Sequence, residues 1–311
     1  MEYSNSTFAS SFILLGLSDS THFQAIYFLL FLVMYIITLF GNMLLIVLVR
    51  ISNQLQTPMY FFLSTLSFID ICFSSTIVPK ILVNTLSKDR SISLSECASQ
   101  MYFSLVLGAT ECIILVSMAY DRYAAICRPL LYNIIMNKRF CLGLNAASWA
   151  VGLSNAAIQV LFTFQLPYCR SHHVNHFFCE VPPFLKLACR DTWLNELLLY
   201  ISAGIIAGLA FFLTLISYIY IISTILKIKS SQSRYKAFST CSSHLTVVSL
   251  YFSTILFMYL HPHSRYSTEI DKTVPVLYTT VTPMLNPIIY SMRNNDVKRI
   301  IKTKVIRKIY F

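Results

Sequence analysis

The feature that most constrains this chain is a series of long stretches without a charged side chain. Residues 20–49, 140–169, 197–226, 237–264 and 273–292 contain no Asp, Glu, Lys or Arg. A helix that crosses the hydrocarbon core of a bilayer needs about 20 mostly apolar residues, so each stretch is long enough to span a membrane. Backbone groups in lipid must be hydrogen-bonded within the segment, which predicts helices.

Two further apolar segments, 57–86 and 97–127, are interrupted by a few charges but read as helices, because large aliphatic and aromatic residues dominate between them. We therefore predict an all-α membrane protein with seven transmembrane helices. The composition agrees, since 56% of the residues are hydrophobic and 12% are charged, against about 45–50% and about 25% in soluble domains. A soluble fold and a disordered chain are excluded.

The distribution of basic residues predicts the orientation. Residues 1–23 contain no Lys or Arg, and most of the 24 basic residues fall on the cytoplasmic side if the N-terminus is outside. The positive-inside rule favours this arrangement, with the C-terminus in the cytoplasm. The net charge of +11 is then a consequence of topology and does not indicate a nucleic-acid partner.

The predicted topology gives a single domain over residues 1–311, with an extracellular tail at 1–23, a helix bundle at 24–292 and a cytoplasmic tail at 293–311. The extracellular tail contains an N-glycosylation sequence at Asn5. In the cytoplasmic tail, apolar residues recur at helical spacing with Lys and Arg mostly at other positions. This pattern predicts a short amphipathic helix that lies on the anionic inner leaflet, with apolar residues at Val297, Ile300, Ile301, Val305 and Ile309.

Four cysteines fall on the predicted outer side, where disulfides persist. Cys97 precedes the third span, and Cys169, Cys179 and Cys189 lie in a long loop at about 165–194. Four cysteines allow three pairings, and spacing alone does not choose among them.

Polar side chains inside the membrane are costly and are usually functional. Asp70 and Glu111 are predicted near mid-depth, and Asn42 and Asn286 lie at comparable depth. One interpretation is a water-filled network that holds protons or a cation such as sodium and differs between two states. The alternative is a static hydrogen-bonded core that fixes helix packing. At the cytoplasmic edge, Asp121-Arg122-Tyr123 is either an interfacial anchor or a contact for a partner.

Several motifs occur in the order that one family uses. They are Gly41-Asn42, LQTPMYFFL at 55–63, MAYDRYAAIC at 118–127, HFFCEVPPFLKLAC at 176–189, Ser217-Tyr218, KAFSTCSSHL at 236–245 and PMLNPIIY at 283–290. Together they resemble the odorant receptors of the rhodopsin-like G-protein-coupled receptor family, most closely the tetrapod-type class II branch. The sequence departs from the usual pattern at Gln56, at Ala124, and at Tyr251-Phe252, where Phe-Tyr is common.

The resemblance implies a plasma-membrane receptor with disulfides Cys97–Cys179 and Cys169–Cys189. It implies that a stimulatory olfactory G protein binds the cytoplasmic face and that cyclic AMP rises. Opening of the sixth helix would free Arg122, beside Asp121 and Tyr123, to contact this partner, and Tyr218 and Tyr290 would support the open form.

The same resemblance implies a ligand pocket between the outer halves of the third, fifth, sixth and seventh helices, capped by the long loop. Helical spacing places five residues on one face of the third helix: Ser104, Leu105, Gly108, Ala109 and Cys112. Positions that match the family's pocket elsewhere are Ser202, Ile206, Phe252, Ile255, Tyr259 and Thr279. We predict a small, largely apolar odorant with one or two hydrogen-bonding groups. Because Ser104 carries no charge, an amine held by a salt bridge there is disfavoured.

The main alternative is a transporter or channel for a small solute, but the sequence has no inverted repeat. An enzyme is disfavoured, because no H-E-x-x-H, G-x-S-x-G or P-loop motif is present, and no cofactor is predicted. Three outer-loop histidines, His172, His173 and His176, are interpreted as solvated side chains rather than metal ligands.

Overall fold

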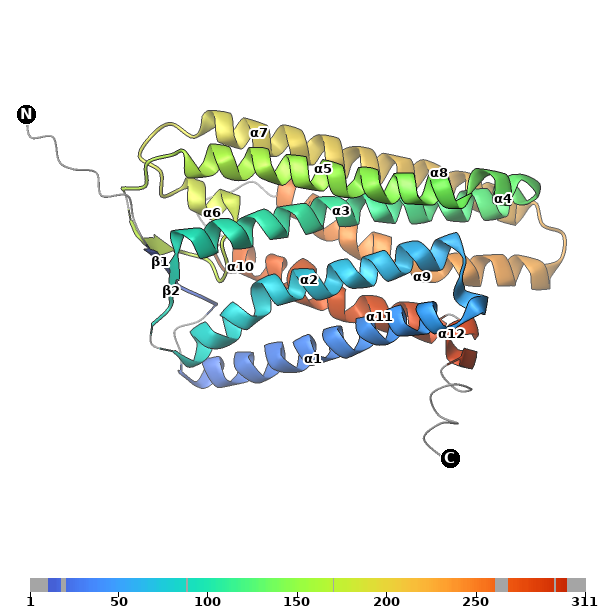
Figure 1. Cartoon of the computed structure of the whole chain (residues 1–311), viewed down its shortest axis with the longest axis horizontal. Coiled ribbons are helices and arrows are strands. Elements are labelled where there is room, and N and C mark those ends of the chain that lie inside the picture. Colours follow the sequence, from blue (N-terminus) through green and yellow to red (C-terminus); the bar gives the residue numbers. More distant parts are fainter. Residues whose placement is uncertain are drawn as a thin grey trace, which may run out of the picture.

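The computed structural model describes residues 11–17, 21–87, 89–169, 171–260, 268–293 and 295–300. It is a bundle of long helices that run side by side, with a small sheet at one end (Figure 1). Five crossings are continuous helices: α1 (Thr21–Ile51), α2 (Pro58–Leu86), α3 (Leu94–Cys127), α5 (Lys138–Phe164) and α9 (Ser231–Leu260). Short elements join them: η1 (Asn53–Leu55), η2 (Pro129–Leu131), α4 (Tyr132–Ile135) and α6 (Val181–Leu185).

The fifth and seventh crossings each contain one turn of π-helix. The fifth consists of α7 (Trp193–Ala203), η3 (Gly204–Gly208) and α8 (Leu209–Leu226), and the seventh of α10 (Thr268–Val276), η4 (Leu277–Val281) and α11 (Thr282–Arg293). Within the described residues, six helices are long and apolar enough to cross a bilayer, the fifth of them running from Trp193 to Leu226. The seventh predicted span is present as α10–η4–α11 and packs against α1, α2 and α9.

Helix α3 lies at the centre of the bundle and packs against α2, α5, α8 and α9. It begins at a capping box, in which Ser93 Oγ accepts from the Glu96 backbone N–H and Glu96 Oε2 accepts from the Ser93 N–H. Ile114, Leu115 and Met118 on α3 are fully buried. Helix α3 therefore contributes side chains to contacts with four neighbouring helices.

A three-stranded sheet closes one end, which we call the sheet end. Strand β1 (Ser11–Leu14) lies between β2 (Ser91–Ser93), to which it is antiparallel, and β3 (His173–Val174), to which it is parallel. Phe12 and Leu14 point inward and are fully buried, whereas Ile13 is exposed. This sheet could not be predicted from the sequence, because it forms from short segments that are far apart in the chain.

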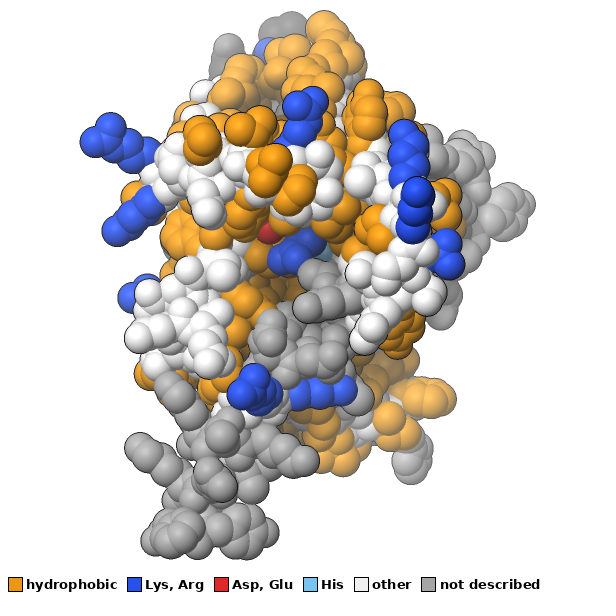
Figure 2. All heavy atoms as spheres, turned by 90° about the vertical axis from the view of Figure 1, so that its right-hand side faces the viewer, with side chains coloured by type: hydrophobic (Ala, Val, Ile, Leu, Met, Phe, Trp, Pro, Cys, Tyr) orange, Lys and Arg blue, Asp and Glu red, His pale blue; other side chains and the backbone are white. Residues whose placement is uncertain are grey.

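The other end carries α12 (Asn295–Ile300) and is called the α12 end. Val297 and Ile300 are buried and Lys298 and Arg299 are exposed, as expected for an amphipathic helix; Ile301, Val305 and Ile309 lie outside the described residues. Figure 2 faces this end and shows many more basic than acidic side chains on it. Since β1 and α12 lie at opposite ends (Figure 1), the chain crosses the bundle an odd number of times.

The sides of the bundle are apolar, as a lipid-facing surface requires. Phe40 is 74% exposed, and Leu161 and Leu209 are also exposed. Apolar side chains exposed in such numbers are not a feature of soluble monomers. The all-α membrane bundle predicted from the sequence is therefore the observed fold.

Candidate functional site

A cavity of about 190 Å³ lies among α3, α7, α9 and the π turns of the fifth and seventh crossings. The loop that carries α6 covers it, contributing Phe178, Glu180, Val181 and Pro182. Most of its wall is apolar, and small residues on α3 leave the space open: Gly108 and Ala109 face it. A mostly apolar concave site with a few polar groups is typical of small-molecule binding.

Eight of the eleven residues that were predicted to bind the ligand line this cavity. From α3 they are Ser104, Leu105, Gly108, Ala109 and Cys112, and from the fifth and sixth crossings they are Ser202, Ile206 and Ile255. The five α3 residues share one face because residues three or four apart on a helix are neighbours.

Phe252 and Thr279 are not among the described residues that line the cavity. The Phe252 ring packs against Phe211, with ring centroids 5.7 Å apart. Thr279 is fully buried, and its hydroxyl donates to the Pro275 carbonyl at 2.7 Å. The side chain of Tyr259 lies outside the described residues.

Tyr251 occupies the position that the sequence analysis gave to Phe252. Its hydroxyl donates to the Gly108 carbonyl at 2.9 Å and lies 3.3 Å from Cys112 Sγ. Tyr251 therefore lines the cavity from the position next to Phe252. Tyr251 is four residues from Ile255 and Phe252 is three residues from it, so helical spacing alone does not choose between them.

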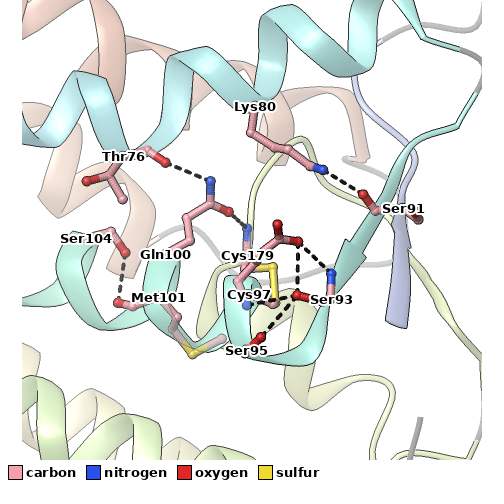
Figure 3. The surroundings of a disulfide bond; sticks show 11 residues. Thr76, Lys80, Ser91, Ser93, Ser95, Cys97, Gln100, Met101, Ser104 and Cys179 are labelled. Atoms are coloured by element: carbon pink, nitrogen blue, oxygen red, sulfur yellow. Dashed lines mark hydrogen bonds between the residues drawn. A yellow bond between two sulfur atoms is a disulfide. The ribbon is translucent and has the colours of Figure 1, made fainter. Parts of the chain in front are cut away.

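Two disulfides and a glutamine fix the cover of the cavity. Both disulfides implied by the resemblance, Cys97–Cys179 and Cys169–Cys189, are present. Gln100 accepts from the Cys179 backbone N–H at 2.8 Å and donates to the Thr76 carbonyl at 3.0 Å, so the loop is joined to both α3 and α2 (Figure 3). Gln100 was not predicted as a site residue.

Glu180 follows Cys179 directly and joins the cover of the cavity to the seventh crossing. Tyr278, in η4, donates to Glu180 Oε1 at 2.9 Å. His176 Nε2 lies 3.7 Å from Glu180 Oε2. The prediction that His176 is solvated was wrong, because this side chain is buried against Phe177 and Phe178.

The four intramembrane polar residues divide into separate contacts. Asn286 donates to both carboxyl oxygens of Asp70, at 3.2 and 3.0 Å. Asn42 donates to the carbonyls of Thr38 and Pro283, which joins α1 to α11. Glu111 is buried and lines the cavity, and its Oε1 has no hydrogen-bond partner among the described residues.

At the α12 end, Arg122 is held within the bundle. Its Nη2 lies 3.6 Å from Asp121 Oδ2, and its Nε donates to Met59 Sδ at 3.3 Å. The Tyr132 hydroxyl donates to Asp121 Oδ1 at 2.8 Å. Burial and the neighbouring Asp121 carboxylate raise the pKa of Tyr132, so the phenol keeps its proton and continues to donate.

The aromatic residues at this end lie on several helices. Tyr218 Oη is 2.7 Å from His244 Nδ1, and His244 Nε2 is 3.2 Å from the Leu115 carbonyl, so one chain of contacts joins α8, α9 and α3. The Tyr290 hydroxyl is buried with no hydrogen-bond partner among the described residues. Tyr123 packs its ring edge-to-face against Tyr220. Arg122, Tyr218 and Tyr290 are therefore inside the bundle but not bonded to one another.

The chain is similar to one group of known proteins along nearly its whole length. A sequence model described as "Olfactory receptor" matches residues 31–308. Olfactory receptor 5AP2 of Mus musculus is 50% identical over 298 residues, which cover 96% of this chain and 94% of that protein. Olfactory receptor 5G3 of Homo sapiens is 46% identical over 308 residues, covering 99% and 98%. Olfactory receptor-like protein OLF1 of Canis lupus familiaris is 48% identical over 305 residues, covering 98% of each.

Proposed function

Because this chain belongs to the olfactory receptor family of G-protein-coupled receptors, we propose that it binds a small, largely apolar odorant in the cavity beneath Glu180. The observation that carries the proposal is the cavity itself, which is closed by a loop fixed at Cys179 and has a mostly apolar wall. Burial of ligand CH₂ groups, about 0.8 kcal/mol each, drives binding. The ligand-contact residues are those that line the cavity, which leaves out Phe252 and Thr279.

The proposed response is activation of a stimulatory olfactory-type G protein and a rise in cyclic AMP. Arg122 is paired with Asp121, as we expect in a receptor whose G-protein-binding site is closed. Movement of α9 away from α3 breaks the His244 contact with the Leu115 carbonyl and frees Tyr218. In this proposed state Arg122 leaves Asp121 and Met59 and contacts carbonyls of the G protein α subunit. An odorant favours this state only through its tighter binding to it.

The proposed topology places the sheet end outside the plasma membrane and the α12 end in the cytoplasm. The excess of Lys and Arg at the α12 end supports this direction, and inner-leaflet lipids are the partners of α12. The whole chain is one receptor domain, and Asn5, which lies outside the described residues, is its glycosylation site. Asp70, Asn286 and Asn42, with Glu111, form a candidate sodium or proton site that distinguishes the two states.

The test expresses the full chain with an olfactory-type G protein and screens volatile compounds for cyclic AMP. Ile255→Ala removes apolar contact, and we expect the potency of an agonist to fall about tenfold or more. Ser104→Ala tests a polar lining position, and Tyr259→Phe tests the position that was predicted from the sequence. Unchanged potency in all three variants would show that this cavity is not the odorant site.

A separate variant tests coupling. Arg122→Glu should abolish the cyclic AMP response at normal surface expression, because the cation that meets the G protein is lost. Arg139→Glu is a matched charge reversal at an exposed position of the same end. Undiminished signalling by Arg122→Glu would contradict this step, and solute flux without any agonist would support a channel instead.

A further inference from the structure

Among the described residues that line the cavity, Asn155 of α5 carries the one carboxamide. The side chain is half-buried, and no described residue forms a hydrogen bond with it. A carboxamide has two N–H donors and one carbonyl acceptor. Asn155 was not predicted as a site residue, because the pocket was expected among the third, fifth, sixth and seventh helices.

The depth of Asn155 in the bundle leaves the cavity as the place where its amide finds a partner. It lies four residues from the midpoint of α5 (Lys138–Phe164), about 6 Å along the helix axis. The outward face of α5 is apolar at this depth, with Val151 and Ile158 exposed on it. A polar group inside the hydrocarbon layer is costly unless it is hydrogen-bonded, and lipid tails offer no partner. The N–H groups of Asn155 therefore indicate an acceptor held in the cavity, either water or a ligand.

A second amide on α5, that of Gln159, shows the contrast. Gln159 is one turn from Asn155 and is 3% exposed. Its Nε2 donates to Ser202 Oγ at 2.9 Å, and Ser202 donates to the Leu199 carbonyl at 3.0 Å. Gln159 thus joins α5 to α7 and is not among the described lining residues, and the proton of Ser202 is committed to the protein.

Two further hydroxyl groups in the cavity wall have also committed their protons. Ser104 donates to the Met101 carbonyl at 3.0 Å (Figure 3), and Tyr251 donates to the Gly108 carbonyl at 2.9 Å. A hydroxyl has one proton and two lone pairs. A ligand that needs a donor would have to break one of these hydrogen bonds, whereas a ligand that donates can use the lone pairs. The N–H groups of Asn155 are available without such a loss.

Three other lining groups carry a proton. The Cys112 thiol is a weak donor, and its sulfur is 3.3 Å from the Tyr251 hydroxyl. Glu111 belongs to the intramembrane polar residues that are proposed above to hold sodium or a proton. Tyr200 is 46% exposed, and its hydroxyl is the alternative donor that the experiment below tests.

We propose that Asn155 recognises the polar group of the ligand, and that this group is a carbonyl, as in a ketone, an aldehyde or an ester, which accepts a hydrogen bond from Asn155 Nδ2. The apolar remainder of the molecule contacts the rest of the wall. An alcohol depends less on Asn155, because it can donate to the oxygens of Ser104 and Tyr251. The inference rests on the proposed odorant-receptor function, since it names the ligand class of the same cavity.

The test uses the full-length receptor in phosphatidylcholine nanodiscs, with thermal unfolding followed by intrinsic fluorescence. The probes are 2-octanone, 2-octanol and 2-methyl-1-octene, which have nearly the same shape and carry a carbonyl, a hydroxyl or a methylene group at the second carbon. Because the lipid takes up each probe equally whichever variant is present, each probe is compared with itself across variants. We expect 2-octanone to stabilise the unmodified receptor, and the absence of this stabilisation overturns the inference.

Two substitutions remove the N–H donors. In Asn155→Leu and in Asn155→Ala, the concentration of 2-octanone that gives half-maximal stabilisation should rise about three- to tenfold relative to that of 2-methyl-1-octene, as the loss of one hydrogen bond predicts. The rise for 2-octanol should be smaller. Leucine is larger than asparagine and alanine is smaller, so a loss common to both variants cannot come from the change in size.

Controls assign the effect to this amide. Asn133→Leu is the matched substitution at an exposed position of α4, at the α12 end, and should leave all three probes unchanged. If 2-octanone and 2-methyl-1-octene change equally in either folded Asn155 variant, the role of Asn155 is refuted. A loss of 2-octanone binding in Tyr200→Phe that Asn155→Leu does not show assigns the donor to Tyr200 and also overturns the inference. Should one Asn155 variant not fold, the other decides.

Cyclic AMP measured in parallel separates the two proposals. If 2-octanone stabilises the receptor through Asn155 but no volatile compound of any class raises cyclic AMP at normal surface expression, the proposed signalling is contradicted and the ligand class is supported. If volatile compounds raise cyclic AMP with a potency that falls in Ile255→Ala but not in Asn155→Leu, the odorant site is supported and the role of Asn155 is overturned.

Discussion

Gly152→Ala should destabilise the bundle where α3 and α5 cross. A Cβ at Gly152 would lie 2.5 Å from Thr110 Oγ1 and 2.7 Å from the Val106 carbonyl oxygen. Neither atom can retreat easily. Thr110 is β-branched and its hydroxyl donates to the same Val106 carbonyl at 2.7 Å, and the carbonyl belongs to the α3 backbone. The two helices must therefore move apart.

The expected loss of stability follows from two destabilising effects and one stabilising effect. Overpacking a well-packed core costs about 1–3 kcal/mol, and disturbing the Thr110 hydrogen bond costs about 1 kcal/mol. Alanine favours a helix over glycine by about 1 kcal/mol. We therefore expect the free energy of unfolding to fall by about 1–3 kcal/mol.

Gly143→Ala provides the control on the same helix, because a Cβ there meets nothing within 4 Å. It keeps the gain in helix propensity without the clash. Both variants should be compared by thermal unfolding of the purified receptor and by surface expression. If Gly152→Ala is as stable as Gly143→Ala, the close α3–α5 contact does not exist in the protein and the reasoning is refuted.

Three other substitutions probe the two ends of the bundle. Phe12→Asp should lower surface expression, because it places a charge in the fully buried side of β1, while Ile13→Asp on the exposed side should not; equal expression of the two would argue against the sheet. Tyr132→Phe removes the hydrogen bond to Asp121 and should raise agonist-independent cyclic AMP at matched expression, and unchanged basal cyclic AMP would show that this bond does not restrain Arg122. Tyr278→Phe removes the hydrogen bond between the seventh crossing and Glu180 in the cover. It should lower agonist potency about tenfold or less without changing surface expression. Unaltered potency would show that this hydrogen bond does not contribute to ligand binding.

Much of the candidate site could be predicted from the sequence because one helix, α3, contributes more lining residues than any other element. The five α3 residues that were predicted to line the cavity recur at spacings of three and four, and helical geometry alone places them on one face. The choice between Tyr251 and Phe252 could not be made in this way. It depends on the rotation of α9 about its axis, which is set by its packing against α3 and α11. Gln100 and Tyr278 were missed because their partners lie on other segments.

The sequence by itself determined the membrane class, the number of crossings and the family, because these depend on the length of apolar stretches and on local motifs. The tertiary structure alone decided where isolated polar groups point. It joined β1 to β2 and β3, which are far apart in the chain, buried His176, and placed Glu111 in the wall of the cavity while Asn286 bonds to Asp70. The physical reason is that the position of a polar group within a helix fixes its depth, whereas its partners depend on how neighbouring helices rotate and pack.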